Sequence, residues 1–198
     1  MIELEKLIEL ENKYYPNVTP ISQYIKEFPL PDEKRKKLYK YRITNIEYLA
    51  ILLFRGNQAS LFQNYHIEKR IPNELELILS NLLDSVLRKL PPAESKYLVR
   101  YDCYSDLNNY KENQIIKVDY YLTATEINLG TVNGTKIIWV ITPLPKNETR
   151  ARRVYLINET EVIPEFQVNY MRETKFRVDK IEPVEFESYS LMYVTEIR

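Results

Sequence analysis

The sequence predicts an α+β fold, in which helices occupy the first half of the chain and strands occupy the second half. Residues 1–95 carry apolar side chains at three- and four-residue spacing, which is the period of an amphipathic helix. Residues 96–198 hold short runs of Val, Ile, Tyr and Thr, and turn residues separate these runs. Because the two kinds of element are segregated and do not alternate, an α+β architecture is expected rather than α/β.

The best helical pattern covers residues 73–90. Its apolar residues fall on one face of a helix. Asn73 can cap the start, and the pair Pro91-Pro92 ends the pattern. A loop is expected over residues 15–31. Further helices are expected over residues 1–12, 31–41 and 44–55.

The strand half shows a similar regularity. Trp139 lies inside an apolar strand run, so it is expected in the core and not at a ligand site. Asn133-Gly134 marks a turn. The expected strands are 96–102, 114–123, 136–142, 152–157, 174–181 and 186–195.

Composition excludes several classes of site. The 198 residues suit one domain, or one domain with an appended segment. A single cysteine and a single histidine, His66, leave no disulfide framework and no zinc site of the usual Cys and His kind. The three glycines cannot form the Gly-rich loops that cradle phosphates in dinucleotide-binding and P-loop folds. No bound metal is therefore expected.

Charge and hydropathy limit the partners. Lys+Arg and Asp+Glu both number 28, so the chain offers no electrostatic case for a nucleic-acid partner. No apolar run reaches the roughly 18 residues of a membrane span, and the first residues lack the basic stretch of a secretory signal. The chain is expected to act in the cytoplasm or to be exported as an effector by a specialised route.

Three polar groups at predicted strand ends could carry chemistry. Glu159 and Glu161 stand two apart, so their carboxylates would share a face of an extended chain as an acid/base or cation-stabilising pair. A solvated acidic turn is the alternative. Arg100 ends an apolar run, where a partly buried guanidinium can hold a phosphate or carboxylate, or can cap the strand at the surface. Thr123 and Thr125 share a strand face and offer hydroxyls to a ligand, although paired threonines are also ordinary strand residues.

Together these groups resemble the R-S-E class of mono-ADP-ribosyltransferases, which includes bacterial arginine-modifying toxins and the vertebrate ecto-enzymes. In that family an apolar strand ends in Arg, another strand runs into Ser-Thr-Ser, and Glu-x-Glu-Val-Leu-Pro follows. The matching segments are Arg100, Thr123-Ala124-Thr125 and Glu159-Thr160-Glu161-Val162-Ile163-Pro164. Phe176-Arg177-Val178 is similar to the strand that follows the glutamates, and the resemblance covers roughly residues 38–195.

The resemblance implies N-terminal helices packed on a mostly antiparallel β-sandwich, with a cleft that binds NAD as a substrate. Arg100 would hold the pyrophosphate, and Tyr101, Thr123 and Thr125 would complete the NAD site. Tyr101 stands where the family usually has glycine, and threonines replace the two serines. Residues 31–198 would form the catalytic domain, with the first 30 residues as a helix and loop extension.

The resemblance also implies the chemistry. Glu161 would stabilise the oxocarbenium-like transition state as nicotinamide leaves, and Thr123 would orient Glu161. Glu159 would sit beside the acceptor, which the family pattern predicts to be an arginine of a target protein. Two alternatives stay open: an NAD glycohydrolase on the same fold, in which water is the acceptor, and a catalytically inactive ADP-ribosyltransferase-like binding module.

Overall fold

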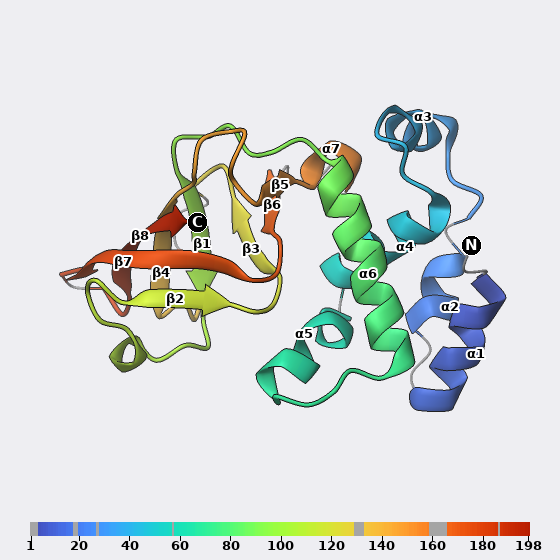
Figure 1. The fold of residues 1–198 in the computed structure, drawn as a ribbon, viewed down its shortest axis with the longest axis horizontal. Coiled ribbons are helices and arrows are strands. Elements are labelled where there is room, and N and C mark those ends of the chain that lie inside the picture. Colours follow the sequence, from blue (N-terminus) through green and yellow to red (C-terminus); the bar gives the residue numbers. More distant parts are fainter. Residues whose placement is uncertain are drawn as a thin grey trace. The chain divides into compact units, whose positions relative to one another are not determined.

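The structure, a computed structural model, describes residues 4–17, 20–26, 28–56, 58–128, 133–158, 166–185 and 187–198. The chain divides into two compact units (Figure 1). One is helical and comprises Met1–Leu90 with Leu156–Asn158. The other carries the strands and comprises Pro91–Tyr155 with Glu159–Arg198. The α+β prediction, with helices before strands, is confirmed. The boundary expected at residue 30 between an extension and a catalytic domain stays a prediction.

The helical unit is built around two helices whose starts were predicted correctly. Thr44 caps α4, and its side chain and backbone form a reciprocal pair of hydrogen bonds with Glu47. Asn73 and Glu76 do the same at the start of α6. Two short helices, α2 and α5, were not predicted. The helices are α1 (Leu4–Tyr14), α2 (Pro20–Ile25), α3 (Asp32–Lys40), α4 (Asn45–Arg55), α5 (Ser60–Ile67) and α6 (Glu74–Lys89), with a short α7 (Tyr155–Asn158) later in the chain.

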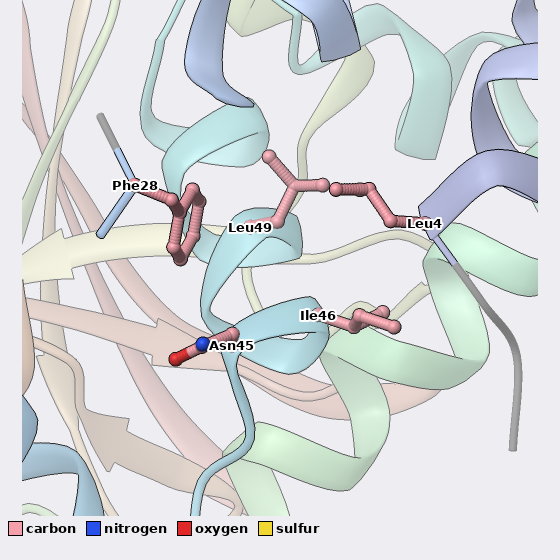
Figure 2. A pocket seen from close by; sticks show the side chains of 5 residues that line it. All are labelled: Leu4, Phe28, Asn45, Ile46 and Leu49. Carbon is pink, nitrogen blue, oxygen red and sulfur yellow. The ribbon is translucent and has the colours of Figure 1, made fainter. Parts of the chain in front are cut away.

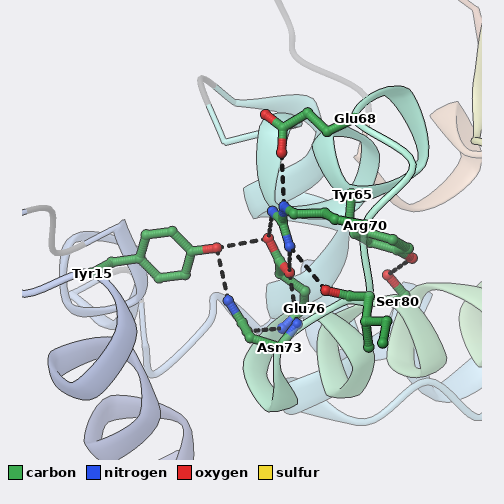
Figure 3. A network of polar contacts seen from close by, with 8 residues as sticks. Tyr15, Tyr65, Glu68, Arg70, Asn73, Glu76 and Ser80 are labelled. Carbon is green, nitrogen blue, oxygen red and sulfur yellow. Dashed lines mark hydrogen bonds and ion pairs between the residues drawn. The ribbon is translucent and has the colours of Figure 1, made fainter.

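A buried carboxylate ties the start of α6 to two other segments of the helical unit (Figure 3). The Glu76 carboxylate is 1% exposed and accepts hydrogen bonds from the Tyr15 hydroxyl at 2.7 Å and from Arg70 Nη1 at 2.7 Å. It also accepts from the backbone N–H of Asn73. Tyr15 follows α1 and Arg70 follows α5, so a single carboxylate joins the ends of these two helices to the start of α6.

The carboxylate of Glu47 joins α4 to α6 in a similar way. It accepts hydrogen bonds from the Ser85 hydroxyl at 2.6 Å and from Lys89 Nζ at 2.5 Å, both on α6. Burial raises the pKa of Glu47, but the bonds from Lys89, Ser85 and Thr44 outweigh it, so the pKa lies below its ordinary value. The carboxylate is therefore charged and fixes the register of the two helices.

The strand unit holds an eight-stranded, mostly antiparallel sheet with the order β2-β7-β8-β4-β1-β3-β6-β5. Its one parallel pair among the described strands is β4 with β8. The strands are β1 (Leu98–Asp102), β2 (Ile115–Val118), β3 (Leu122–Thr125), β4 (Ile137–Thr142), β5 (Ala151–Arg153), β6 (Gln167–Tyr170), β7 (Thr174–Pro183) and β8 (Ser190–Ile197).

The sheet is weakly joined at one place. β1 and β4 pair along the whole of β1, from Leu98 opposite Ile141 to Asp102 opposite Ile137. In contrast, the register between β1 and β3 consists of a single pair, Val99 opposite Thr125. The join separates a part with five strands from a part with three, β3, β6 and β5. The sandwich and its NAD cleft stay predictions.

Trp139 lies in the core of the strand unit, as predicted. It is 1% exposed and belongs to an apolar cluster that includes Leu98 and Phe176. Its ring meets Tyr110 edge-on, with centroids 5.7 Å apart, and Phe176 at 6.2 Å. The tryptophan therefore packs the interior beside β1 and is not presented to a ligand.

Three strand predictions were wrong in their extent. The strand expected over residues 186–195 is β8, which begins at Ser190 and ends at Ile197. The run 114–123 is two strands, because β2 ends at Val118, beside β7 at one edge of the sheet, and β3 begins at Leu122 beside β6. The run 152–157 is a strand only as far as Arg153. Residues Tyr155–Asn158 form the short helix α7, in which Ile157 is fully buried.

Candidate functional site

Arg100 is partly buried, which fits the first of the two alternatives that the sequence left open for it. It lies at the middle of β1, opposite Trp139 of β4. Because side chains alternate along a strand, Arg100 shares its face with Leu98 and Asp102, which are both buried. The arginine side chain itself is 21% exposed. This face of β1 thus begins with an apolar residue and continues with two charged ones.

The guanidinium of Arg100 reaches across the weak join of the sheet. Its Nη1 donates to the main-chain oxygen of Thr123 at 3.1 Å. Its Nη2 lies 4.0 Å from Asp102 Oδ2. Its Nε is buried and has no hydrogen-bond partner within the described ranges. A planar group with a buried free donor can take an anionic ligand such as a phosphate or carboxylate.

Asp102 was missed in the sequence analysis. Its carboxylate accepts from the backbone N–H groups of Tyr104 and Ser105, both at 3.0 Å, and from the Ser105 hydroxyl at 2.7 Å. Burial raises the pKa of Asp102, but the bonds from Ser105 and Tyr104 and the charge of Arg100 outweigh it and leave the pKa below its ordinary value. A signal existed: two residues apart on one strand, Arg100 and Asp102 must share a face.

Thr123 and Thr125 share a face of β3, and the register carries that face onto β6. Thr123 lies opposite Asn169, and Thr125 opposite Gln167. Gln167 Nε2 donates to Asn169 Oδ1 at 3.0 Å. Asn169 is fully buried, and its Nδ2 has no partner in the part of the chain that the structure describes. The three-stranded part of the sheet thus has a buried polar face.

That polar face was also missed. The opposite face, with Leu122, Ala124, Val168 and Tyr170, belongs to the apolar core. The alternation was present in the run Gln167 to Tyr170, where polar and apolar residues follow one another at period two. β6 was not predicted as a strand, so its polar residues were not assigned to a face.

Tyr101 lies next to Arg100 on β1 and on the other face of that strand. It is opposite Ile138 of β4, and its hydroxyl donates to Asn128 Oδ1 at 2.9 Å. The side chain that replaces the family's glycine therefore points away from the face of Arg100.

Glu159 and Glu161 lie outside the described residues. Tyr155 and Phe166, one before and one after this segment, both belong to the strand unit. Tyr155 donates from its hydroxyl to Glu126 Oε2 at 3.0 Å, and its ring lies edge-on to Phe166 with centroids 5.3 Å apart. Glu126 in turn donates its backbone N–H to the oxygen of Phe166. Glu126 directly follows Thr125 in the chain, so the end of β3 and Phe166 are held together.

The helical unit contains an apolar cavity of about 260 Å³ (Figure 2). Leu4, Phe28, Ile46 and Leu49 line it, and Asn45 is the polar residue among the lining residues. None of the described residues that line it is ionisable, so within the described ranges this cavity offers no acid, base or charge for bond cleavage.

The described residues contain no group of three or more His, Cys, Asp or Glu side chains arranged to hold a metal ion. None of the helices in those ranges has the length and apolar character needed to cross a membrane.

Comparisons with known proteins identify the fold. No family model matches the sequence, and no curated protein matches it. Solved structures do match. The type III effector XopAI from Xanthomonas axonopodis pv. citri has a TM-score of 0.70 and 17% identity, over 98% of this chain and 81% of XopAI. Plx2a, an ADP-ribosyltransferase toxin from Paenibacillus larvae, has a TM-score of 0.65 and 17% identity, over 84% of this chain and 94% of Plx2a.

A third match is exoenzyme S from Pseudomonas aeruginosa, solved with the human 14-3-3 protein β and carba-NAD. It has a TM-score of 0.65 and 15% identity, over 88% of this chain and 86% of exoenzyme S. The chain therefore has the fold of ADP-ribosyltransferase toxins, and the resemblance read from the sequence is confirmed at the level of the fold.

Proposed function

We propose that this protein cleaves NAD, releases nicotinamide and transfers ADP-ribose to a side chain of a target protein. The observation that carries the proposal is the meeting of Arg100 and Thr123. These two residues match the first and second blocks of the family pattern, and they are 23 positions apart in sequence yet hydrogen-bonded. The chain in which this hydrogen bond forms has the fold of ADP-ribosyltransferase toxins.

NAD is the proposed substrate, and the residues at the join suit it. The Arg100 side chain is 21% exposed, and its one hydrogen bond within the described ranges uses Nη1 alone, which supports a role for the guanidinium in holding the pyrophosphate. The backbone of Tyr101 and the hydroxyls of Thr123 and Thr125 are proposed to bind the rest of the nucleotide. That exoenzyme S was solved with carba-NAD supports this assignment.

Cleavage of the bond between nicotinamide and ribose needs little acid assistance. The nicotinamide ring of NAD is already cationic, so it leaves as a neutral molecule. The ribose passes through an oxocarbenium-like transition state. A carboxylate beside it stabilises that charge more in the transition state than in the ground state. We assign this role to Glu161, with Thr123 holding it in place.

The acceptor is proposed to be an arginine. Glu159 would orient the guanidinium and assist the loss of its proton, which arginine otherwise gives up reluctantly. Residues 31–198 are proposed as the catalytic domain. An exported effector acting on a host or competitor protein is the proposed setting, by analogy with the effector XopAI.

Nicotinamide release from NAD by the purified chain tests the proposal. We expect release from the wild type, no release from Glu161→Gln, and unchanged release from Glu187→Gln, which alters an exposed carboxylate of the strand unit. Label from NAD should appear on protein in a cell lysate, and Glu159→Gln should lose that label and keep some hydrolysis. Release without labelling would make the chain an NAD glycohydrolase. Neither release nor NAD binding by calorimetry would make it an inactive binding module.

A further inference from the structure

Helix α3 and the residues just after it carry a cluster of positive side chains, although the chain as a whole has no net charge. Six lysines and arginines stand against two acids between residues 32 and 42, whereas the whole chain has a net charge of zero. Leu38 is the one buried side chain of α3. The helix is therefore anchored by a single apolar residue and presents nearly all of its other side chains outward.

The outer face of α3 combines cations with an aromatic ring. Asp32, Arg35, Lys36 and Tyr39 recur at the spacing of one helix face and line a shallow hollow of about 490 Å³. Tyr39 is 87% exposed, although tyrosine is a residue that usually buries its ring. An exposed aromatic ring among cations is typical of a surface that binds a partner, and not of one that packs inside the fold.

The carboxylates of α3 neutralise its first turns and leave its end basic. Asp32 pairs with Arg35, and Glu33 lies 3.5 Å from Lys37. Lys34 does not belong to this outer face, because its Nζ donates to the main-chain oxygen of Ile157 at 2.9 Å. These pairs account for both acids.

The cations at the end of α3 are not paired with carboxylates in the same way. Lys36, Lys40 and Arg42 are exposed, and no carboxylate within the described ranges pairs with any of them. Lys40 lies over the ring of Tyr41, 5.3 Å from its centroid. We call Lys36, Tyr39, Lys40 and Arg42 the α3 basic face.

We propose that the α3 basic face binds an anionic lipid surface. Clusters of lysine and arginine on a helix are attracted to acidic headgroups, and each cation near the surface strengthens binding roughly fivefold. Tyrosine favours the boundary between headgroups and acyl chains, where its ring is apolar and its hydroxyl is wet. The proposal does not depend on NAD turnover.

A nucleic acid is the less favoured occupant of this face. Binding to a phosphate backbone draws on many cations spread along a groove, and single strands add several stacking rings. Here one exposed ring and two cations lie on α3, and a third cation, Arg42, lies just beyond its end, in a chain of balanced charge. A flat, anionic surface meets such a face without needing a groove.

Sedimentation of the whole chain with lipid vesicles tests the proposal. We expect binding to phosphatidylcholine vesicles that contain about one third phosphatidylserine, weak binding to phosphatidylcholine alone, and loss of binding at high salt. The double variant Lys36→Gln/Lys40→Gln should bind roughly 25-fold less tightly, and Tyr39→Ala should bind less tightly than wild type. Lys13→Gln is the matched control, because Lys13 is an exposed lysine beside a tyrosine on α1.

Three results would overturn the proposal. Equal binding to both kinds of vesicle would remove the role of charge. Unchanged binding by the double variant, or an equal loss in Lys13→Gln, would move the site elsewhere on the chain. Binding of a short oligonucleotide or a polyglutamate peptide that the double variant loses, without vesicle binding, would give the α3 basic face a different occupant. Far-UV circular dichroism of each variant checks that α3 and its neighbours stay folded.

Discussion

Arg100 Nη1 donates a hydrogen bond to the main-chain oxygen of Thr123 at 3.1 Å, and the bond crosses the join between β1 and β3, where the described strands share a single residue pair. The arginine thus does two things at once. It reinforces the join between β1 and β3, and it holds its own guanidinium in a fixed plane beside the buried Asp102. A ligand bound by the remaining donors would meet a group that is already oriented.

Arg100→Lys should weaken NAD binding far more than it weakens the fold. Lysine keeps the charge but not the planar fork, so it cannot bond Thr123 and a phosphate in the same geometry. We expect the KM for NAD to rise about tenfold or more, and the free energy of unfolding to fall by only about 1 kcal/mol. Nicotinamide release at several NAD concentrations, with urea unfolding of the same variant, measures both.

Arg177→Lys is the control for this prediction. Arg177 lies on β7 and pairs with Asp179 at the exposed surface, so its KM should match that of the wild type. An Arg100→Lys variant with unchanged KM would remove Arg100 from the proposed NAD site, whatever its effect on stability.

Thr123 and Thr125 should separate activity from stability. Thr125 is 6% exposed, and its hydroxyl oxygen accepts from the backbone N–H of Ile127 at 3.2 Å. Thr125→Val would leave that N–H without its partner and should cost about 1–2 kcal/mol of stability. Thr123 is half-buried, and Thr123→Val keeps its shape and its main-chain oxygen. It should lower kcat for nicotinamide release and change stability by less than about 0.5 kcal/mol.

Thr123→Ser tests whether the hydroxyl of residue 123 is the group that supports activity. It restores a hydroxyl without the methyl group, and the family pattern has serine at this position, so kcat should return to at least the wild-type value. If Thr123→Val were as active as the wild type, the hydroxyl would have no part in orienting Glu161.

Local signals made part of this fold predictable. The starts of α4 and α6 follow from Thr44 with Glu47 and from Asn73 with Glu76, because a capping box is complete within four residues. Helix α5 gave no comparable signal, since its buried residues are few and polar side chains interrupt them. Gly56 ends α4 with a φ of −77°, so this position does not need the left-handed conformation that favours glycine. Tyr24 approaches so closely that a side chain at position 56 would collide with it.

Distant pairing was the part that the sequence did not determine. The resemblance indicated Arg100 and Thr123 separately, but their hydrogen bond depends on how β1 meets β3. The buried Asn169 was missed because it enters the polar face only through the register of β3 with β6. A register is set by packing over the whole sheet, and a run of four residues carries too little pattern to reveal it.

Acid should unfold the helical unit partly through Glu76. Burial raises the pKa of Glu76, but the bonds from Arg70, Asn73 and Tyr15 outweigh it, so the pKa lies below the ordinary value of 4.5. A carboxyl with a lowered native pKa stabilises the fold fully at pH values above its unfolded pKa. That contribution is lost as the pH falls through the native pKa, because the unfolded chain binds the proton first.

Glu76→Gln should therefore lower stability near pH 7 by about 1–3 kcal/mol and flatten the decline in stability below pH 4.5. The glutamine leaves the Arg70 guanidinium without its buried carboxylate and cannot gain a proton. Urea unfolding followed by circular dichroism at 222 nm, repeated from neutral to acid pH, measures both effects. Glu9→Gln is the control, because Glu9 is 69% exposed on α1. A Glu76→Gln variant that declined in acid as steeply as the wild type would show that other carboxylates, such as Glu47, govern the acid limb.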